Sequence, residues 1–261
     1  MNFQWAKLRA GLVVLAAVIG MCCIGGPLAR RAMAVPPHPP AEAILSDIHD
    51  MFQELSKTVG GLSKEQQAKV DAMEKDIAAK LKAKPDVEPS ESDVLLQFRA
   101  ILTDAQKVKF DKFLNDARAR AAEALTSSNL KLMFGAVTIY ANEHANAMPP
   151  DLGTMLSATF TPKNCLVGNS KTAIPADLAS QDIKKQAAWV NAHAEFAYLG
   201  AGKNQTKVDG GFVLAYVKAP GARTNFLFAD GSVYVYDQAV AAKLIADVKA
   251  GKNPPPSRPP L

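Results

Sequence analysis

Two histidines and one cysteine in the second half of the chain are the residues best suited to hold a transition metal. His144, His193 and Cys165 could supply three nitrogen and sulfur ligands of the kind that zinc prefers, if folding brings them together. A zinc hydrolase is therefore one hypothesis. The alternative is two surface histidines and a buried thiol, because nothing in the spacing of the three residues requires a shared site. We expect no bound metal and no other cofactor.

Other catalytic patterns are incomplete or missing. His193 and Glu195, separated by one residue, together with Cys165 suggest a zinc deaminase, but the second cysteine pair of that enzyme class is not in the sequence. The sequence also contains no nucleophile elbow, phosphate-binding loop, His-Glu-x-x-His helix or dinucleotide fingerprint. These observations favour a protein that is not an enzyme.

Residues 225–236 predict a β-hairpin, because two alternating apolar runs flank Asp230 and Gly231. An Asp-Gly pair is typical of a type I′ turn, which needs positive φ at both central residues. Asp230 could instead bind calcium, although its position at the turn already accounts for it. The aromatic residues of the hairpin could bind a glycan or peptide, but cross-strand packing is the simpler interpretation. These aromatic residues are Phe226, Phe228, Tyr234 and Tyr236.

Residues 41–128 predict helices, since apolar side chains recur every three or four positions among many Ala, Lys, Glu and Gln residues. Gly60, Gly61 and the proline-containing stretch 84–90 interrupt the pattern. We therefore expect a short helical hairpin that serves as a spacer.

Two helix starts in this region share one design, a hydroxyl residue followed three positions later by glutamine. The two pairs are Ser63 with Gln66 and Thr103 with Gln106. Each is a capping box, in which the hydroxyl and the glutamine side chain each accept from the other residue's backbone N–H. Read as Leu-(Ser/Thr)-x-x-Gln, the two motifs resemble those of the Spy/CpxP-like periplasmic family. That resemblance implies an ATP-independent chaperone or a metal-responsive envelope-stress sensor.

The second half of the chain predicts an α+β domain. Ser127 and Ser128 suggest a helix cap, and a helix pattern follows over residues 129–144. Apolar runs at 196–199 and 212–217, with the 225–236 hairpin, could form a four-stranded antiparallel sheet. A last helix is expected over 237–249.

The order of these elements is similar to the C-terminal domain of a prepilin-like, pseudopilin-type bacterial family. The helix pattern Asn-Leu-Lys-x-x-x-x-Ala-x-x-x-Tyr-x-Asn-x-His and the following Met-Pro-Pro lie at 129–150, and a proline-flanked cysteine follows at 162–165. A strand running into Gly-x-Gly lies at 196–202, and Asn-Phe-Leu-Phe-Ala-Asp-Gly-Ser-Val lies at 225–233. The resemblance covers residues 127–237. It implies a pilin-like helix packed on a small antiparallel sheet, as in type II secretion pseudopilins.

The amino terminus predicts export. Lys7 and Arg9 precede an uncharged apolar run over residues 10–29, and Ala34 ends a small-x-small cleavage signal. Arg30 and Arg31 lie between the two, which leaves an uncleaved membrane anchor as the alternative. Either version places residues 35 onward outside the cytoplasm, in the periplasm or at the cell surface.

Charge and cysteine content restrict the partners. Removing the four basic leader residues from 30 leaves 26 against 25 acidic residues, so no strong positive charge remains for nucleic acid. Cys22 and Cys23 lie in the apolar run, and Cys165 is the only cysteine of the exported part, so no internal disulfide is expected there.

The sequence thus divides into five expected segments. They are a signal peptide or anchor (1–34), a proline-rich linker (35–40), a helical region (41–128), a pilin-like α+β domain (129–250) and a proline-rich disordered tail (251–261). The main hypothesis is a non-enzymatic cell-envelope protein that contacts envelope or secreted proteins, with the membrane contacted through residues 10–29 if the leader stays attached. The alternative is a Spy-like chaperone or sensor that works through residues 41–128.

Overall fold

The computed structural model describes residues 41–84 and 89–258 of the chain. Its contacts define two compact units, Met1–Arg118 and Ala119–Leu261, which divide within one long helix. The fold class is α+β, because helices account for the first unit and a four-stranded antiparallel sheet lies in the second. The expected leader, with its apolar run 10–29, and the linker 35–40 lie outside the described residues. Among the described helices, none combines the length and apolar character needed to cross a membrane.

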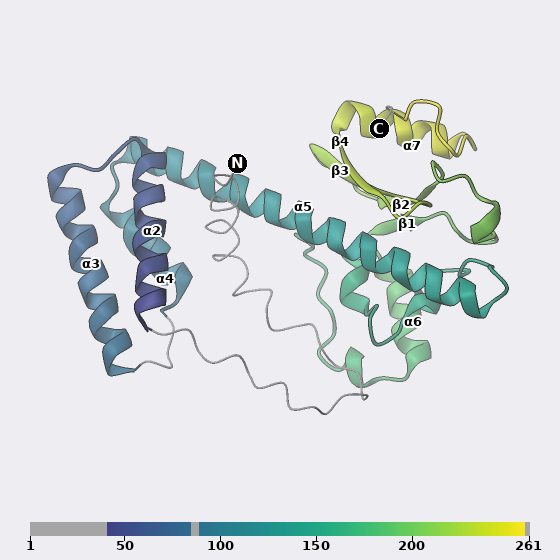
Figure 1. Ribbon diagram of the computed structural model, residues 1–261, viewed down its shortest axis with the longest axis horizontal. Helices are drawn as coiled ribbons and strands as arrows, with labels where there is room; N and C mark the ends of the chain where they lie inside the picture. Colours follow the sequence, from purple (N-terminus) through teal and green to yellow (C-terminus); the bar gives the residue numbers. More distant parts are fainter. Residues whose placement is uncertain (1–40, 85–88, 259–261) are drawn as a thin grey trace. The chain divides into compact units, whose positions relative to one another are not determined.

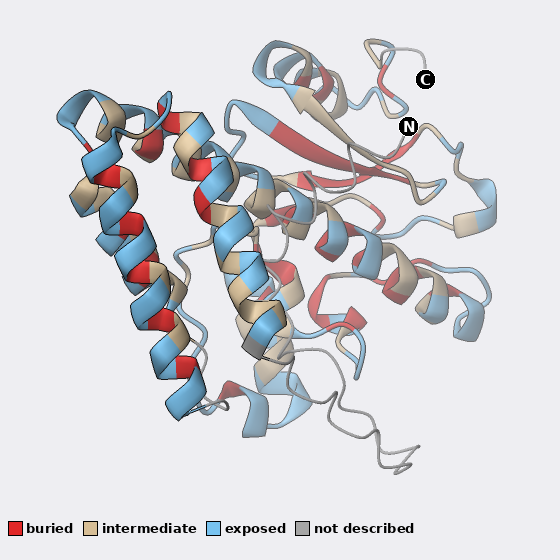
Figure 2. Cartoon of the chain, turned by 60° about the vertical axis from the view of Figure 1, so that its left-hand side comes forward, coloured by how far each residue is buried: buried red, intermediate tan, exposed pale blue. Residues whose placement is uncertain are grey.

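The helical unit contains α2 (Ala41–Val59), α3 (Lys64–Ala83), α4 (Glu91–Ile101) and the first part of α5 (Asp104–Glu143). Gly60 and Gly61 separate α2 from α3 with positive φ values of 94° and 91°. The buried positions of α3 recur at helical spacing and form one stripe (Figure 2). The α2–α3 hairpin expected from the sequence is present, and α4 and α5 add to it. The buried side chains of this core are Phe52, Leu55, Val59, Val70, Met73, Ile77, Leu81, Val94, Phe98, Leu102 and Phe110.

Helix α5 runs without a break through the position where the sequence predicted a helix start. The hydroxyls of Thr126 and Ser128 donate to the carbonyl oxygens of Ala122 and Ala124, at 2.7 and 3.0 Å. Serine and threonine can bond back to the carbonyl four residues earlier, which lets them lie inside a helix instead of capping it. The predicted cap at Ser127 and Ser128 is therefore wrong, and the two units divide earlier in the chain than the expected boundary at 128.

The second unit is built on a sheet of four antiparallel strands in the order β1-β2-β3-β4. The strands are β1 (Phe196–Tyr198), β2 (Val213–Val217), β3 (Arg223–Phe228) and β4 (Val233–Asp237). Each strand pairs with its sequence neighbour, so the sheet is a simple meander. The strand positions agree with the alternating runs in the sequence.

Helices cover both faces of this sheet (Figure 1). On one face, Leu130 and Met133 of α5 belong to a buried cluster with Leu214 and Leu227 of the strands. On the other face, α7 (Gln238–Lys249) packs through Leu244 against the opposite side chains of β2 and β3. The segment between α5 and β1 carries α6 (Ile183–His193) and the short turns Gly153–Met155, Pro162–Cys165 and Leu178–Ser180, and Gln205–Lys207 lies between β1 and β2.

The segment after α7 packs against the sheet, in contrast to the disordered tail expected from its prolines. The Asn253 side chain accepts from the Val213 backbone N–H at 2.7 Å and donates to the Val213 carbonyl at 3.0 Å. Pro255 is buried, and the Arg258 guanidinium lies 3.9 Å from the centre of the Phe228 ring. Prolines prevent helix and strand formation, but they do not prevent packing as an extended chain.

Candidate functional site

The two histidines proposed as metal ligands are used locally. His144 stacks on Tyr140 with ring centres 3.7 Å apart, and its Nδ1 lies 2.8 Å from the Tyr140 carbonyl oxygen. His193 repeats this arrangement with Trp189, at 4.7 and 2.8 Å. Each imidazole thus folds back on the helix turn that precedes it.

Cys165 lies in the core of the α+β unit and has no exposed surface. Burial raises the pKa of its thiol to about 12, so the thiolate that would bind zinc is strongly disfavoured. Within residues 41–84 and 89–258, no three His, Cys, Asp or Glu side chains are grouped closely enough to hold a metal ion. The structure therefore does not bring His144, His193 and Cys165 together.

Glu195, the acid considered for a deaminase, organises a loop. Its Oε2 accepts from the Val167 backbone N–H at 2.8 Å, and its Oε1 accepts from the hydroxyls of Ser170 and Thr172 at 2.7 and 3.0 Å. Three hydrogen bonds occupy most of the acceptor capacity of this carboxylate. Glu195 is therefore a structural residue of the segment after Cys165.

The Asp230–Gly231 hairpin is present, but the predicted type I′ turn is wrong. Gly231 alone in the loop has a positive φ, 83°, and its N–H donates to the Phe228 carbonyl at 3.0 Å. Phe228 N–H in turn donates to the Ser232 carbonyl at 2.9 Å. This is a type I turn followed by a left-handed glycine bulge. Asp230 Oδ1 accepts from the Ser232 N–H at 2.8 Å and from the Ser232 hydroxyl, which holds Asp230 at negative φ.

The aromatic side chains of the hairpin pack across the strands, as predicted. Phe226 and Tyr236 meet edge to face with ring centres 5.7 Å apart, and Phe228 and Tyr234 do the same at 5.9 Å. Phe226 and Phe228 are completely buried, so they cannot bind a glycan.

Asn225 ties β3 to α5. Its buried side-chain Nδ2 donates to the Ser127 hydroxyl at 2.7 Å and to the Glu123 carbonyl at 3.2 Å. Nearby, Arg223 Nε lies 3.1 Å from Glu123 Oε2. Asn225, the first residue of the 225–233 stretch, thus fixes the sheet against the long helix.

The two capping boxes of the helical unit form as predicted. Gln66 Oε1 accepts from the Ser63 N–H at 2.9 Å, and Gln106 Oε1 accepts from the Thr103 N–H at 3.0 Å. Both glutamines therefore satisfy backbone donors that helix starts leave free.

The two motifs also bond to each other. Gln66 Nε2 donates to the Ile101 carbonyl at 3.0 Å, and Gln106 Nε2 donates to the Gly61 carbonyl at 2.7 Å. Each acceptor lies two residues before the hydroxyl of the opposite motif, so the exchange is reciprocal. Gln66 Nε2 also lies 2.7 Å from Gln106 Oε1. These long-range bonds could not be read from the capping pattern, which describes each helix start alone.

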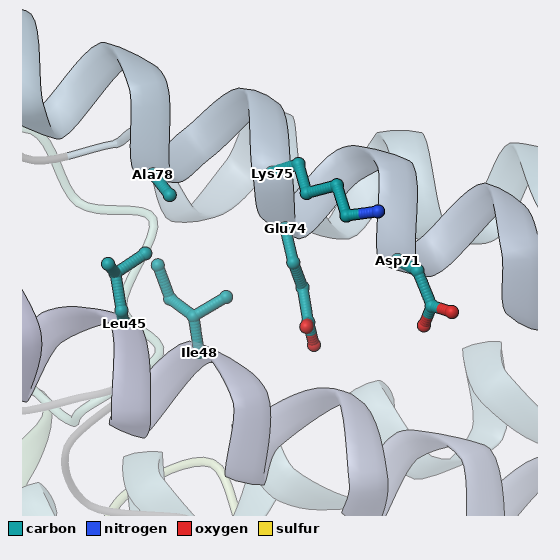
Figure 3. Close-up of a pocket in the computed structure, with 6 residues that line it drawn as sticks. All are labelled: Leu45, Ile48, Asp71, Glu74, Lys75 and Ala78. Atoms are coloured by element: carbon teal, nitrogen blue, oxygen red, sulfur yellow. The ribbon is translucent and has the colours of Figure 1, made fainter.

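A hollow of about 410 Å³ lies between α2 and α3. Figure 3 shows Leu45 and Ile48 pointing from α2 toward α3, with Asp71 and Glu74 projecting from the opposite helix. His49 Nδ1 lies 3.1 Å from Glu74 Oε1. The hollow therefore has apolar side chains at its base and charged side chains around it, a composition typical of protein-binding surfaces.

A second hollow, of about 460 Å³, lies beside the outer edge of the sheet in the α+β unit. We call it the β1 hollow. Its lining residues are Pro150, Asp151, Leu152, Asn191, Ala194, Phe196, Ala197, Tyr198 and Lys218.

The polar side chains of the β1 hollow differ in what they can still bind. Burial tends to raise the pKa of Asp151. Hydrogen bonds from Thr154, Asn191 and Gly153 have the larger effect, so the pKa lies below its ordinary value. Lys218 Nζ donates to the Ala194 carbonyl at 2.7 Å, which leaves two of its three N–H groups. Asp151 is therefore an ionised carboxylate whose Oδ1 accepts from the Thr154 N–H and hydroxyl at 2.8 and 2.9 Å, and Lys218 is a cation that keeps two N–H donors.

Tyr198 adds a neutral hydroxyl to this region. Its oxygen is buried and has no hydrogen-bond partner among the described residues. Burial, followed by the nearby Tyr140 and Asp151, raises the pKa of Tyr198 far above its ordinary value, so the hydroxyl stays protonated. Gly200 makes room for it, since a Cβ at that position would clash with the hydroxyl oxygen.

Comparison with protein-family models, curated proteins and solved structures gives no match to this chain.

The sequence indicated the hairpin and both glutamine motifs, but it did not indicate the β1 hollow. Asp151, Asn191, Tyr198 and Lys218 come from four separate stretches and share no motif.

Proposed function

We propose that this chain is a non-enzymatic exported cell-envelope protein whose α+β unit, residues 119–258, is a pseudopilin-like head with a structural or protein-binding role. The packing of α5 on the antiparallel meander supports the proposal, with Leu130, Met133 and Val137 fully buried. One long helix lying on a small antiparallel sheet is the arrangement that the prepilin-like resemblance implies.

The state of the ionisable side chains also supports a binding role. Asp151 and Glu195 are each held by several hydrogen bonds, and Cys165 is enclosed in the core. A general base or nucleophile must be able to reach a substrate and exchange a proton with it. These three side chains are not placed for that work.

Fractionation of host cells, with intact mass and N-terminal sequencing of the recovered protein, tests the proposal. We expect the chain outside the cytoplasm, either starting at Val35 or carrying its leader in the membrane fraction. The control is a variant without residues 2–34, which should remain in the cytoplasm. Recovery of the full-length chain from the cytoplasm alone would overturn the proposal.

The reciprocal bonds of Gln66 and Gln106 favour a second candidate function, a Spy-like chaperone. These bonds fix the starts of α3 and α5. The hollow between α2 and α3 lies in the same unit and leaves Leu45 and Ile48 partly exposed. An apolar groove of this kind could hold an unfolding client.

Suppression of client aggregation by the full chain tests this second candidate. Ile48→Ser should reduce suppression, because it removes apolar surface from the hollow. Leu96→Ser is the matched control, since Leu96 is 64% exposed in the same unit but does not line the hollow. If the wild-type chain gives no protection, the chaperone function is excluded.

A further inference from the structure

The two edges of the sheet in the α+β unit are not equivalent. The β1 edge is a strand of three residues, and its Phe196 is 1% exposed. The β4 edge is a strand of five residues, of which residues 233–236 all keep some exposed surface. β4 lies at the opposite side of the sheet from β1, next to β3 (Figure 1). The β4 edge is therefore the more accessible of the two.

The pairing of β4 with β3 fixes which backbone groups of β4 point outward. Phe228 N–H donates to the Ser232 carbonyl at 2.9 Å, and the two strands continue from this bond in one register. Hydrogen-bonded pairs alternate along an antiparallel ladder, so the even-numbered residues of β4 bond to β3. The N–H and C=O groups of Val233 and Val235 therefore point away from the sheet. In the described part of the chain, no other strand pairs with them.

β4 lacks the features that normally protect an exposed edge. Native proteins prevent the pairing of edge strands with proline, with lysine and other charges, or with a bulge. Residues 233–236 contain no charge and no proline, and β4 pairs with β3 without a shift of register. Valine and tyrosine also favour strands. The edge is therefore suited to binding a further strand.

The sequence of β4 fits a second copy of itself. In an antiparallel pair centred on Val235, the N–H and C=O groups of this residue bond to those of the partner's Val235. Tyr234 then lies opposite the partner's Tyr236, in the non-hydrogen-bonded type of pair, where side chains are closest. Aromatic pairs across strands are stabilising. Asp237 lies opposite the partner's Val233, so the two carboxylates stay at opposite ends of the contact.

We propose that two copies of this chain associate through the outer edge of β4, as an antiparallel strand pair centred on Val235 that joins the two sheets into one. The contact uses the same surface on both copies, so it closes as a dimer with two-fold symmetry. This inference goes beyond the proposed function, because it concerns the purified chain and does not depend on export.

Sedimentation velocity of the purified full chain over a range of concentrations tests the dimer. Val235→Pro removes the outward N–H, which does not bond to β3, and edge strands tolerate proline on that side. It should weaken dimerisation at least about tenfold, because the symmetry removes two hydrogen bonds at once. Val235→Thr is the matched control, since it keeps the N–H and the β-branched shape, and it should change dimerisation less than about threefold.

Hydrogen exchange gives a second measurement on the same samples. The Val233 and Val235 amides should be protected in the dimer and should exchange quickly in the monomer. A wild-type chain that stays monomeric at every concentration would overturn the proposal. So would a Val235→Pro dimer as stable as the wild type, or a dimer in which these two amides are not protected.

A charge exchange at the symmetry axis keeps the proposal testable if Val235→Pro does not fold. Residue 235 meets its own copy, so Val235→Lys alone or Val235→Glu alone places two like charges side by side, which is destabilising. Each variant should be monomeric, whereas an equimolar mixture should form a dimer. Folded variants that do not dimerise when mixed would contradict pairing centred on Val235.

Photo-crosslinking in host cells identifies the occupant of the edge. A benzoylphenylalanine at Tyr234 should crosslink two copies of the chain, and one at Ile139, exposed on α5 of the same unit, should not. Crosslinks from position 234 to other proteins alone would overturn the second copy as occupant and leave the protein-binding role in place. A dimer with the expected crosslink in a chain that stays in the cytoplasm would count against the proposed function alone.

Discussion

Gly231 is required for two reasons that substitution can separate, its positive φ and the close approach of the Phe134 ring. It adopts a φ of 83°, and a Cβ there would lie 2.7 Å from Phe134 Cε1. Gly202 has a φ of 70° but open space around it. We expect Gly202→Ala to cost about 1 kcal/mol of unfolding free energy from backbone strain alone. Gly231→Ala should cost about 1–3 kcal/mol more, because Phe134 must move.

Urea unfolding of both glycine variants, followed by circular dichroism, measures the difference. Equal losses for Gly231→Ala and Gly202→Ala would show that Phe134 yields without cost. In that case the hairpin turn would not be held against α5.

Cys165 predicts a particular dependence of stability on pH. Burial raises the thiol pKa from 9.0 to about 12, so above pH 9 the unfolded chain loses this proton while the folded chain keeps it. A raised folded-state pKa gives stability that is complete below the unfolded pKa and is lost as pH rises toward the folded value. Between these values Cys165 should reduce the unfolding free energy by about 1.4 kcal/mol per pH unit.

The Cys165→Ala variant isolates this effect from the titration of lysines and tyrosines. Unfolding free energies of both proteins at about pH 8 and about pH 10 should converge as pH rises, because the variant lacks the thiol. Parallel losses in the two proteins would mean that the thiol is not buried in its neutral form.

Among the elements, the reciprocal glutamine bonds should be coupled energetically. Gln66→Ala should cost about 1–2 kcal/mol, since it leaves the partly buried bonds to Ser63 N–H and the Ile101 carbonyl unmade. Gln106→Ala should cost less, about 0.5–1.5 kcal/mol, because its bonds to Thr103 N–H and the Gly61 carbonyl are exposed. The double variant should cost less than the two losses added together, with a coupling of about 0.5–1.5 kcal/mol. Gln67→Ala is the control, because Gln67 bonds only to Asp71 on its own helix, and it should cost less than about 0.5 kcal/mol. Additive losses in the denaturant titrations would contradict the coupling.

The elements that the sequence predicted well are those specified by local pattern. The strands around residues 213–217 and 223–228 follow alternating apolar runs, and the start of α3 follows the Ser63 capping box. Local preferences are enough when the tertiary structure agrees with them.

The elements and contacts that the sequence did not predict depend on distant residues or on a choice between two local options. Ser128 can cap a helix or bond back within one, and its bond to the Ala124 carbonyl decides for the second. Asp230 and Gly231 suit two hairpin loops, and the bonds to Ser232 select the longer one. The β1 hollow is defined only once the chain has folded, so no spacing in the sequence could have indicated it.

At the scale of the whole molecule, two separate cores predict two unfolding transitions. Leu81 is enclosed by the helical unit and Leu214 by the α+β unit, each almost without exposed surface. Leu81→Ala and Leu214→Ala should each destabilise their own unit by about 2–5 kcal/mol. Calorimetry of the full chain should then show that each variant shifts only one transition. A shift of both by either variant would mean that the units unfold together.

The hydrogen bonds of Asn225 also affect how fast the two units fold. They join residues 98 and 102 positions apart, whereas the glutamine bonds of the helical unit span 35 and 45. Domains built on distant contacts fold over about milliseconds to seconds, and helical domains with nearer contacts fold in about microseconds to milliseconds. When the denatured chain is diluted out of denaturant, the helices of the first unit should therefore form early. The sheet should form later, because β3 and α5 are far apart in the chain and must first come into contact.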